Sequence, residues 1–206
     1  SWNSDKDILM HQDGKWVLFN IETRLDRPYR PVWKEEKVYK KGRSLYYQSG
    51  NGLVLTIGGS RDENITYGQY VSRNEFGIED GIFFAPDSSK VAFYRKDESR
   101  VTSFPLLDIT TRTGSLKEIK YPMAGMDSEN IQLGIYDLAS GKTIYANVNE
   151  YGYDQYLTNI SWSPDATKVF IQVLDRSQKH MKLNMYDTTD GKFIKTILTE
   201  DNEKYV

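Results

Sequence analysis

The feature that most constrains the fold of this chain is a repeated turn followed by an apolar strand. The two better copies are residues 86–93 (PDSSKVAF) and 164–171 (PDATKVFI), and a weaker copy is 12–19 (QDGKWVLF). An aromatic strand precedes each better copy, at 82–85 and 160–163. Because Pro fixes φ and Asp caps the backbone of a tight turn, each copy predicts a β-hairpin.

A second repeat follows the first. Residues 135–137 (IYD) with Gly141 recur fifty positions later as 185–187 (MYD) with Gly191, and each predicts another hairpin. Joined, the two repeats give four strands in about forty residues, which is the size of one β-propeller blade. We therefore predict an all-β fold, a partial β-propeller of about four four-stranded antiparallel blades, with a meander or sandwich as the alternative.

The blades are not equally long. Asp165 and Asp187 are 22 residues apart, whereas the equivalent Asp87 and Asp137 are 50 apart. The earlier blade is therefore predicted to carry an insertion, about 97–125, between its second and third strands. An insertion of this length commonly serves a partner or another domain, and the alternative is a loop that packs on its own blade.

Composition limits the partners. The net charge of −2 does not favour nucleic acid or an anionic membrane as a partner. The absence of cysteine excludes disulfides and Cys-based zinc sites, and no cofactor or metal is expected. No apolar run approaches the roughly 18 residues of a membrane-spanning helix. The way the chain starts and stops suggests a piece of a longer protein.

Four further motifs carry a family resemblance: 67–78 (YGQYVSRNEFGI), 83–87 (FFAPD), 91–99 (VAFYRKDES) and 121–125 (YPMAG). Together they resemble the dipeptidyl peptidase IV branch of the prolyl oligopeptidase superfamily. The residues of these motifs are most similar to those of bacterial, exported members. The resemblance implies that residues 1–206 are a fragment of an eight-bladed propeller.

The resemblance also implies a function. The propeller would belong to a homodimeric, periplasmic or exported serine peptidase whose α/β-hydrolase domain is absent from this chain. Such enzymes remove di- or tripeptides, usually ending in proline, from oligopeptides with a free N-terminus, and the propeller gates access and binds that N-terminus. The alternative from another class is a free-standing, propeller-like scaffold that binds protein partners.

Family propellers bind the substrate amine with a Glu-Glu pair, because a partly desolvated ion pair fixes how far the peptide threads. Aligned on Phe76, the resemblance places that pair on Asn74 and Glu75, beside Arg73, so one glutamate remains. Glu75 is the first-choice amine ligand, with a solvated loop residue as the alternative. The lost glutamate makes tripeptide release a credible variant.

The resemblance also suggests Arg30, within Pro-Tyr-Arg-Pro, as the arginine near the substrate carbonyls, against the alternative of a surface arginine.

Catalytic chemistry is not visible in the sequence. No Gly-x-Ser-x-Gly motif occurs, and the two histidines, His11 and His180, are predicted to be solvated turn residues. Paired carboxylates at 62–63, 79–80 and 97–98 are adjacent, so on a strand their side chains would point to opposite faces. We therefore assign no catalytic residue and expect the chain alone to be inactive.

Overall fold

The computed structural model describes residues 6–12, 15–24, 26–28, 37–49, 53–204 and 206. The chain divides into two compact units, Ser1–Lys37 with Gln48–Leu53, and Val38–Tyr47 with Val54–Val206. No helix in the described part of the chain is long and apolar enough to cross a membrane.

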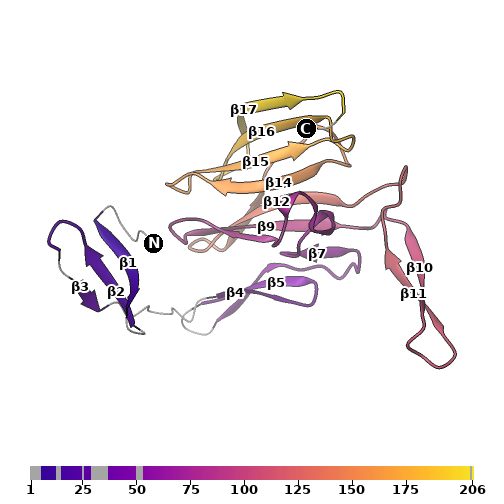
Figure 1. The fold of residues 1–206 in the computed structure, drawn as a ribbon, viewed down its shortest axis with the longest axis horizontal. Helices are drawn as coiled ribbons and strands as arrows, with labels where there is room; N and C mark the ends of the chain where they lie inside the picture. The colour runs from indigo at the N-terminus through magenta and orange to yellow at the C-terminus, as the bar shows by residue number, and fades with distance from the viewer. Residues whose placement is uncertain (1–5, 13–14, 25, 29–36, 50–52, 205) are drawn as a thin grey trace. The chain divides into compact units, whose positions relative to one another are not determined.

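The first unit holds one antiparallel sheet of β1 (Asp7–Gln12), β2 (Lys15–Asn20) and β3 (Asp26–Pro28), in that order (Figure 1). The hairpin expected from the weaker copy of the repeat is confirmed. His11 was predicted to lie in a turn, and this was wrong. The ladder between β1 and β2 continues through His11, which lies opposite Trp16, because the pairing extends to Gln12 and Lys15.

The second unit contains three sheets of three or more strands that follow one another along the chain, and a two-stranded hairpin (Figure 1). The first is formed by β4 (Lys37–Lys41), β5 (Ser44–Gln48) and β6 (Val54–Gly58). The next contains β7 (Ile65–Tyr67), β8 (Ile82–Phe84), β9 (Lys90–Asp97), β12 (Asn130–Asp137) and β13 (Lys142–Tyr145). The last contains β14 (Tyr156–Trp162), β15 (Lys168–Leu174), β16 (His180–Asp187) and β17 (Phe193–Asp201). His180, also predicted to be a turn residue, begins β16, where it is paired opposite Asp201.

The predicted aspartate-capped turns are confirmed in both better copies of the first repeat. In the β8–β9 turn, Oδ1 of Asp87 accepts a hydrogen bond from the N–H of Ser89 at 2.9 Å. In the β14–β15 turn, Oδ1 of Asp165 accepts from the N–H of Thr167 at 3.1 Å. The same chemistry at the same offset produces the same hairpin in two successive blades.

The second repeat also forms equivalent hairpins, β12–β13 and β16–β17. The N–H groups of Gly141 and Gly191 donate to the backbone oxygens of Asp137 and Asp187 at 2.9 and 3.0 Å, and both glycines have positive φ angles of 67° and 74°. A residue with a side chain is strained in that conformation, which explains why both copies of the turn carry glycine.

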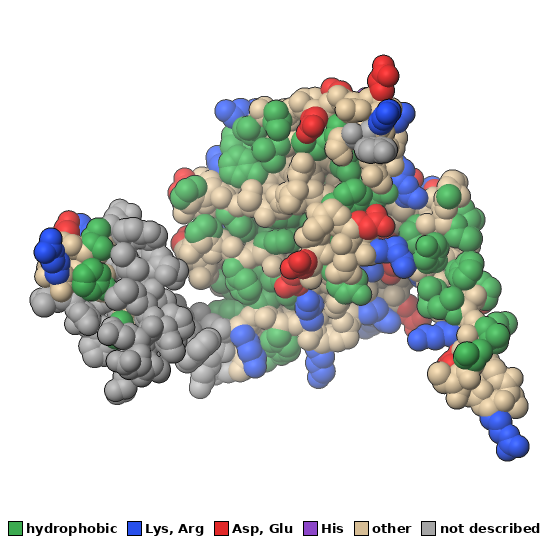
Figure 2. Space-filling model, viewed as in Figure 1, with side chains coloured by type: hydrophobic (Ala, Val, Ile, Leu, Met, Phe, Trp, Pro, Cys, Tyr) green, Lys and Arg blue, Asp and Glu red, His purple; other side chains and the backbone are tan. Residues whose placement is uncertain are grey.

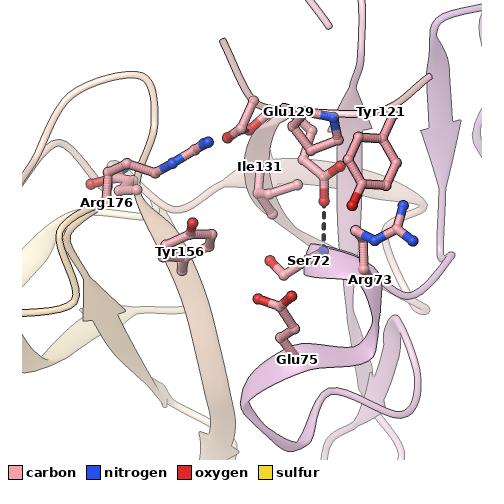
Figure 3. Close-up of a pocket in the computed structure, with 11 residues that line it drawn as sticks. Ser72, Arg73, Glu75, Tyr121, Glu129, Ile131, Tyr156 and Arg176 are labelled. Atoms are coloured by element: carbon pink, nitrogen blue, oxygen red, sulfur yellow. Dashed lines mark hydrogen bonds between the residues drawn. The ribbon is translucent and has the colours of Figure 1, made fainter. Parts of the chain in front are cut away.

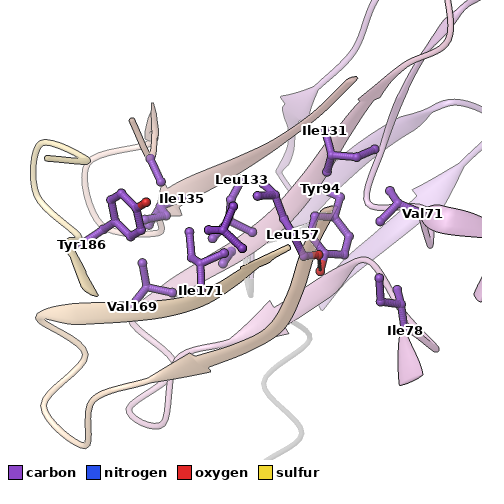
Figure 4. Packing of buried hydrophobic residues seen from close by; sticks show 13 residues of the cluster. Val71, Ile78, Tyr94, Ile131, Leu133, Ile135, Leu157, Val169, Ile171 and Tyr186 are labelled. Atoms are coloured by element: carbon purple, nitrogen blue, oxygen red, sulfur yellow. Dashed lines mark hydrogen bonds between the residues drawn. The ribbon is translucent and has the colours of Figure 1, made fainter. Parts of the chain in front are cut away.

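The three sheets of the second unit pack face to face through two apolar clusters. The cluster between the β4–β6 sheet and the β9 sheet includes Leu45, Tyr67 and Phe93. The cluster between the β9 sheet and the β14–β17 sheet is larger and includes Leu133 and Ile171, both fully buried (Figure 4). All-β sheets packed in succession, without closure into a barrel, form a partial β-propeller, as the repeats predicted.

A two-stranded hairpin, β10 (Ser103–Asp108) and β11 (Ser115–Lys120), occupies the segment between β9 and β12. Figure 1 shows it projecting away from the sheets, and Figure 2 shows hydrophobic side chains along its length. Leu107 lies opposite Leu116 across the hairpin, and their side chains are 66% and 73% exposed. The hairpin therefore carries an exposed apolar surface.

One edge of the β9 sheet is interrupted. β7 and β8 both pair with β9, one at each end, and residues between them leave the sheet as a loop. The loop closes on Tyr94, whose backbone oxygen accepts the N–H of Gly68 at 2.8 Å and whose N–H donates to the oxygen of Gly81 at 3.0 Å. This closure sets where the predicted site residues lie.

Candidate functional site

The loop between Gly68 and Gly81 contains the segment η1 (Ser72–Gly77), which is a pair of tight turns. The N–H of Asn74 donates to the oxygen of Val71, and the N–H of Ile78 donates to the oxygen of Glu75. Ser72, Asn74 and two other residues of the segment that are not glycine have positive φ angles, between 50° and 63°. Each costs about 1 kcal/mol or more, and such strain gathers at binding sites.

This segment forms one wall of a cavity of about 150 Å³. The opposite walls come from the base of the β10–β11 hairpin, the start of β12, the start of β14 and the turn after β15 (Figure 3). The lining residues are Ser72, Arg73, Glu75, Tyr121, Pro122, Ser128, Glu129, Ile131, Gln155, Tyr156 and Arg176. The cavity therefore lies between two neighbouring sheets, where five segments of the chain meet.

Glu75, the first-choice ligand, lines this cavity, and Figure 3 shows its carboxylate pointing into it below Ser72. The side chain is exposed, and it forms no ion pair with any Lys or Arg in the described ranges. Its neighbour Phe76 packs on Tyr156 with ring centroids 4.9 Å apart, which fixes the end of the turn. The carboxylate is thus held at the cavity by its backbone and remains available to a ligand.

The other predicted residues are distributed differently. Arg73 also lines the cavity, but its guanidinium lies over the ring of Tyr121, 4.5 Å from the ring centroid. Asn74 lines a neighbouring hollow together with Lys96 and Lys120 and does not line the cavity of Glu75. Arg30 lies outside the described residues.

Sequence reasoning missed Glu129, which the fold brings into the same cavity. Its side chain is buried, and its Oε1 accepts a hydrogen bond of 2.6 Å from the N–H of Ser72. Burial raises the pKa of the Glu129 carboxyl, an effect opposed by the Ser72 hydrogen bond and by the charges of Lys96 and Arg73. Glu129 is a single glutamate just before a buried strand and lies at no regular distance from the residues of a recognised motif. No signal in the sequence therefore identifies it as a site residue.

Two polar atoms at the cavity are buried without a hydrogen-bond partner in the described part of the molecule, Oγ of Ser72 and Nη1 of Arg176. Burial raises the pKa of Tyr156; the charge of Arg176 opposes this effect, and the negative charges of Glu75 and Glu129 reinforce it. Both carboxylates therefore act electrostatically on the same phenol. The two acids and the free hydroxyl of Ser72 are acceptors suited to a ligand ammonium, whereas the unpaired Nη1 of Arg176 is a donor suited to a ligand oxygen.

The described residues offer little for catalysis or metal binding. His180 is exposed, and its Nδ1 lies 2.6 Å from Oδ1 of Asp201. No cluster of three or more His, Asp or Glu side chains that could hold a metal ion occurs among the described residues.

Comparisons with known proteins are consistent with this architecture. Residues 28–206 match the family model of the dipeptidyl peptidase IV N-terminal region. A protein assigned as dipeptidyl-aminopeptidase B from Uncinocarpus reesii is 22% identical over 221 residues, which cover 93% of this chain and 24% of that protein.

Two crystal structures are similar. A Bacteroides ovatus protein assigned as a dipeptidyl aminopeptidase IV has a TM-score of 0.71 and 36% identity, covering 100% of this chain and 30% of that one. Porphyromonas gingivalis dipeptidyl peptidase 4 has a TM-score of 0.75 and 18% identity, covering 98% of this chain and 31% of that one. The chain thus spans 24% of the Uncinocarpus reesii protein and about a third of these solved chains.

Proposed function

The chain belongs to the family of dipeptidyl peptidase IV N-terminal regions, and from this premise we propose that it is the substrate-gating, N-terminus-binding segment of an exported serine exopeptidase. The parent enzyme would remove di- or tripeptides after proline. The proposal draws on the similar proteins, which are assigned as dipeptidyl peptidases and aminopeptidases and are several times longer than this chain.

The observation that carries the proposal is the position of Glu75. A carboxylate without an intramolecular counter-ion, held by strained turns at the mouth of a cavity, is suited to bind the α-ammonium group of a peptide. The cavity is about 150 Å³, enough for the end of a chain and not for a folded protein. This geometry favours substrates with a free, extended N-terminus.

Cleavage itself is assigned to an α/β-hydrolase domain elsewhere in the parent protein. The sequence contains no Gly-x-Ser-x-Gly motif, so the nucleophile elbow of that fold is not supplied by these residues. The role of this segment is to position the substrate. Binding of the substrate amine at Glu75 would fix how many substrate residues lie between that amine and the nucleophile. The enzyme would then cleave only a short peptide from the N-terminus, as an exopeptidase does.

The test is Glu75→Gln in the full-length enzyme, with kcat/KM measured on a glycyl-prolyl chromogenic substrate. Loss of a charged hydrogen bond to the ammonium predicts a fall of about 10-fold to 100-fold, mainly through KM. Glu79→Gln is the matched control, because Glu79 is exposed in the same loop and does not line the cavity. An unchanged kcat/KM for Glu75→Gln would refute the proposed role.

We also propose that the parent enzyme is a homodimer that uses the β10–β11 hairpin. The exposed pair Leu107 and Leu116 supplies an apolar surface of the kind that a second subunit covers. Light scattering of the full-length protein should give the mass of a dimer. Replacing both leucines by Asp should give the mass of a monomer, and a dimer that persists would contradict this use of the hairpin.

The proposed location is the periplasm or the exterior of a bacterial cell. Support comes from motifs that resemble exported bacterial members and from the bacterial origin of the two similar crystal structures. Fractionation of cells that express the full-length protein from its own gene tests this proposal. Recovery of the enzyme with cytoplasmic markers would overturn it.

A further inference from the structure

Glu129 is a buried acid whose charge no cation neutralises. Its side chain is only 8% exposed, yet no Lys or Arg of the described ranges forms an ion pair with it. Among the cations around it, the two whose charges lower its pKa, Arg73 and Lys96, are engaged elsewhere. The guanidinium of Arg73 lies over Tyr121, and Nζ of Lys96 is 3.3 Å from Oε1 of Glu98. Burying an unpaired carboxylate is costly, so a positively charged ligand would relieve this site.

The hydrogen bond from Ser72 uses one of the two carboxylate oxygens. Oε1 accepts that N–H at 2.6 Å, and among the described hydrogen bonds none reaches Oε2. A carboxylate can accept several hydrogen bonds, so this group keeps acceptor capacity on the side that lines the cavity. The Ser72 contact therefore anchors Glu129 without satisfying it.

Ser72 provides a second unsatisfied acceptor between the two acids. Its residue is 7% exposed, and its Oγ is buried with no hydrogen-bond partner in the described part of the chain. Figure 3 shows the Ser72 side chain between the carboxylates of Glu75 and Glu129. A buried hydroxyl without a partner is rare and points to an absent ligand.

An ammonium group has three N–H donors and no acceptor. We propose that Glu129 and Oγ of Ser72 complete, with Glu75, a three-acceptor site for the α-ammonium group of the substrate. This inference rests on the proposed function, since it assumes that Glu75 binds the same amine.

A purely structural role for Glu129 makes a different prediction. If Glu129 only tethers the turn through the N–H of Ser72, then Gln at this position would serve as well, because its side-chain oxygen accepts the same hydrogen bond. Glu129→Gln removes the charge and keeps the tether. Ser72→Ala removes the hydroxyl and keeps the backbone N–H that Glu129 accepts.

The experiment measures inhibition of the full-length enzyme by a short peptide product, valyl-proline, and by its analogue in which hydrogen replaces the amine. Glu129→Gln should weaken inhibition by valyl-proline about 10-fold or more and leave the desamino analogue within about twofold. Ser72→Ala should weaken only valyl-proline, by about 3-fold to 10-fold. Glu79→Gln should change neither constant.

The outcomes separate this inference from the proposed function. If Glu75→Gln weakens valyl-proline and Glu129→Gln does not, the three-acceptor site is wrong and the role of Glu75 stands. If Glu75→Gln has no effect, the proposed function fails, and this site fails with it whatever Glu129→Gln shows. If Glu129→Gln does not fold, as thermal unfolding would reveal, Ser72→Ala decides, and wild-type inhibition by valyl-proline in that variant would overturn the inference.

Discussion

The phenol hydroxyl of Tyr94 in β9 donates a hydrogen bond of 2.7 Å to the backbone oxygen of Leu157 in β14. The side chain is 1% exposed, and burial raises the pKa of its phenol. The bond connects the β9 sheet to the β14–β17 sheet beside the large apolar cluster. The backbone of the same residue also closes the loop that carries Glu75. Tyr94 therefore couples the packing of two blades to the geometry of the site.

Tyr94→Phe tests this coupling. The substitution keeps the ring and leaves the oxygen of Leu157 buried without its donor, so we expect a loss of about 1–3 kcal/mol in the free energy of unfolding. Tyr70→Phe is the control, because Tyr70 is 48% exposed and should change stability little. Urea unfolding of the full-length protein measures both. Equal stability of the two variants would mean that the hydrogen bond does not hold the blades together.

Gly81→Ala tests the closure of the loop. A Cβ at Gly81 would overlap the backbone oxygen of Gln69, so the two ends of the loop, which meet at Tyr94, must move apart. Gly125→Ala is the matched control, because its φ of +75° strains any side chain while the space around it is free. We expect Gly81→Ala to lower kcat/KM on a glycyl-prolyl substrate about 10-fold and Gly125→Ala to cost only about 1 kcal/mol of stability. Identical kinetics in both variants would show that the closure of the loop ends does not position the site.

The repeated hairpins could be predicted because their information is local. Turn residues such as Asp87 and Asp165 cap the backbone two positions ahead, and the alternation of apolar residues fixes each strand. Glu75 could also be placed on a loop before β8, from the motif that contains it. These features depend on neighbours in sequence.

The cavity could not be predicted, because its walls meet only in the folded chain. Glu129 comes from the segment after the inserted hairpin, and Arg176 comes from the next blade. Nothing in the spacing of these residues relates them to Glu75. The strand pairs that flank the loop, which place β7 and β8 on one edge of β9, are equally non-local. Distant pairing of this kind is fixed by packing and leaves no periodic signal.

Asp187→Asn tests an ion pair inside the repeat. The pKa of Asp187 is lowered to about 2, first by the hydrogen bond from Nζ of Lys168 at 2.6 Å and then by the N–H of Thr189. A lowered pKa gives stability that is present above the ordinary value of 3.8 and is lost as the pH falls toward about 2. The variant should therefore lose up to about 1 kcal/mol at pH 7, since the pair is partly exposed, and progressively less below pH 4.

The matched control for that pair is Asp137→Asn. Asp137 occupies the same place in the earlier copy of the repeat and caps its turn through the N–H of Ser140, without an ion pair to Lys in the described residues. Lys90 lies opposite Asp137 as Lys168 lies opposite Asp187, so the difference between the two variants measures what the direct ion pair of Lys168 adds. Urea unfolding between pH 7 and pH 3 measures it, and a difference that does not shrink on acidification would contradict the assigned pKa.

The last prediction concerns the buried carboxyl of Glu129. Burial raises its pKa above the ordinary value of 4.5, so its stabilising contribution is complete below that value and is lost as the pH rises through the raised pKa. In Glu129→Gln this loss is absent, and the wild type should lose stability relative to the variant as the pH rises from 4 to 8. The charged or titratable groups around Glu129 are Arg73, Glu75, Lys96, Glu98, Lys120, Tyr156 and Arg176.

A peptide with a free amine should reverse that pH dependence. If its ammonium binds ionised Glu129, valyl-proline should raise the unfolding temperature of the wild type more at pH 7 than at pH 5, because binding favours the charged carboxylate while the peptide amine is still protonated. The desamino analogue should show no such difference, nor should valyl-proline with Glu129→Gln. Thermal unfolding at both pH values measures this. Stabilisation by valyl-proline that is the same in wild type and variant at pH 7 would mean that the charge of Glu129 does not reach the ligand.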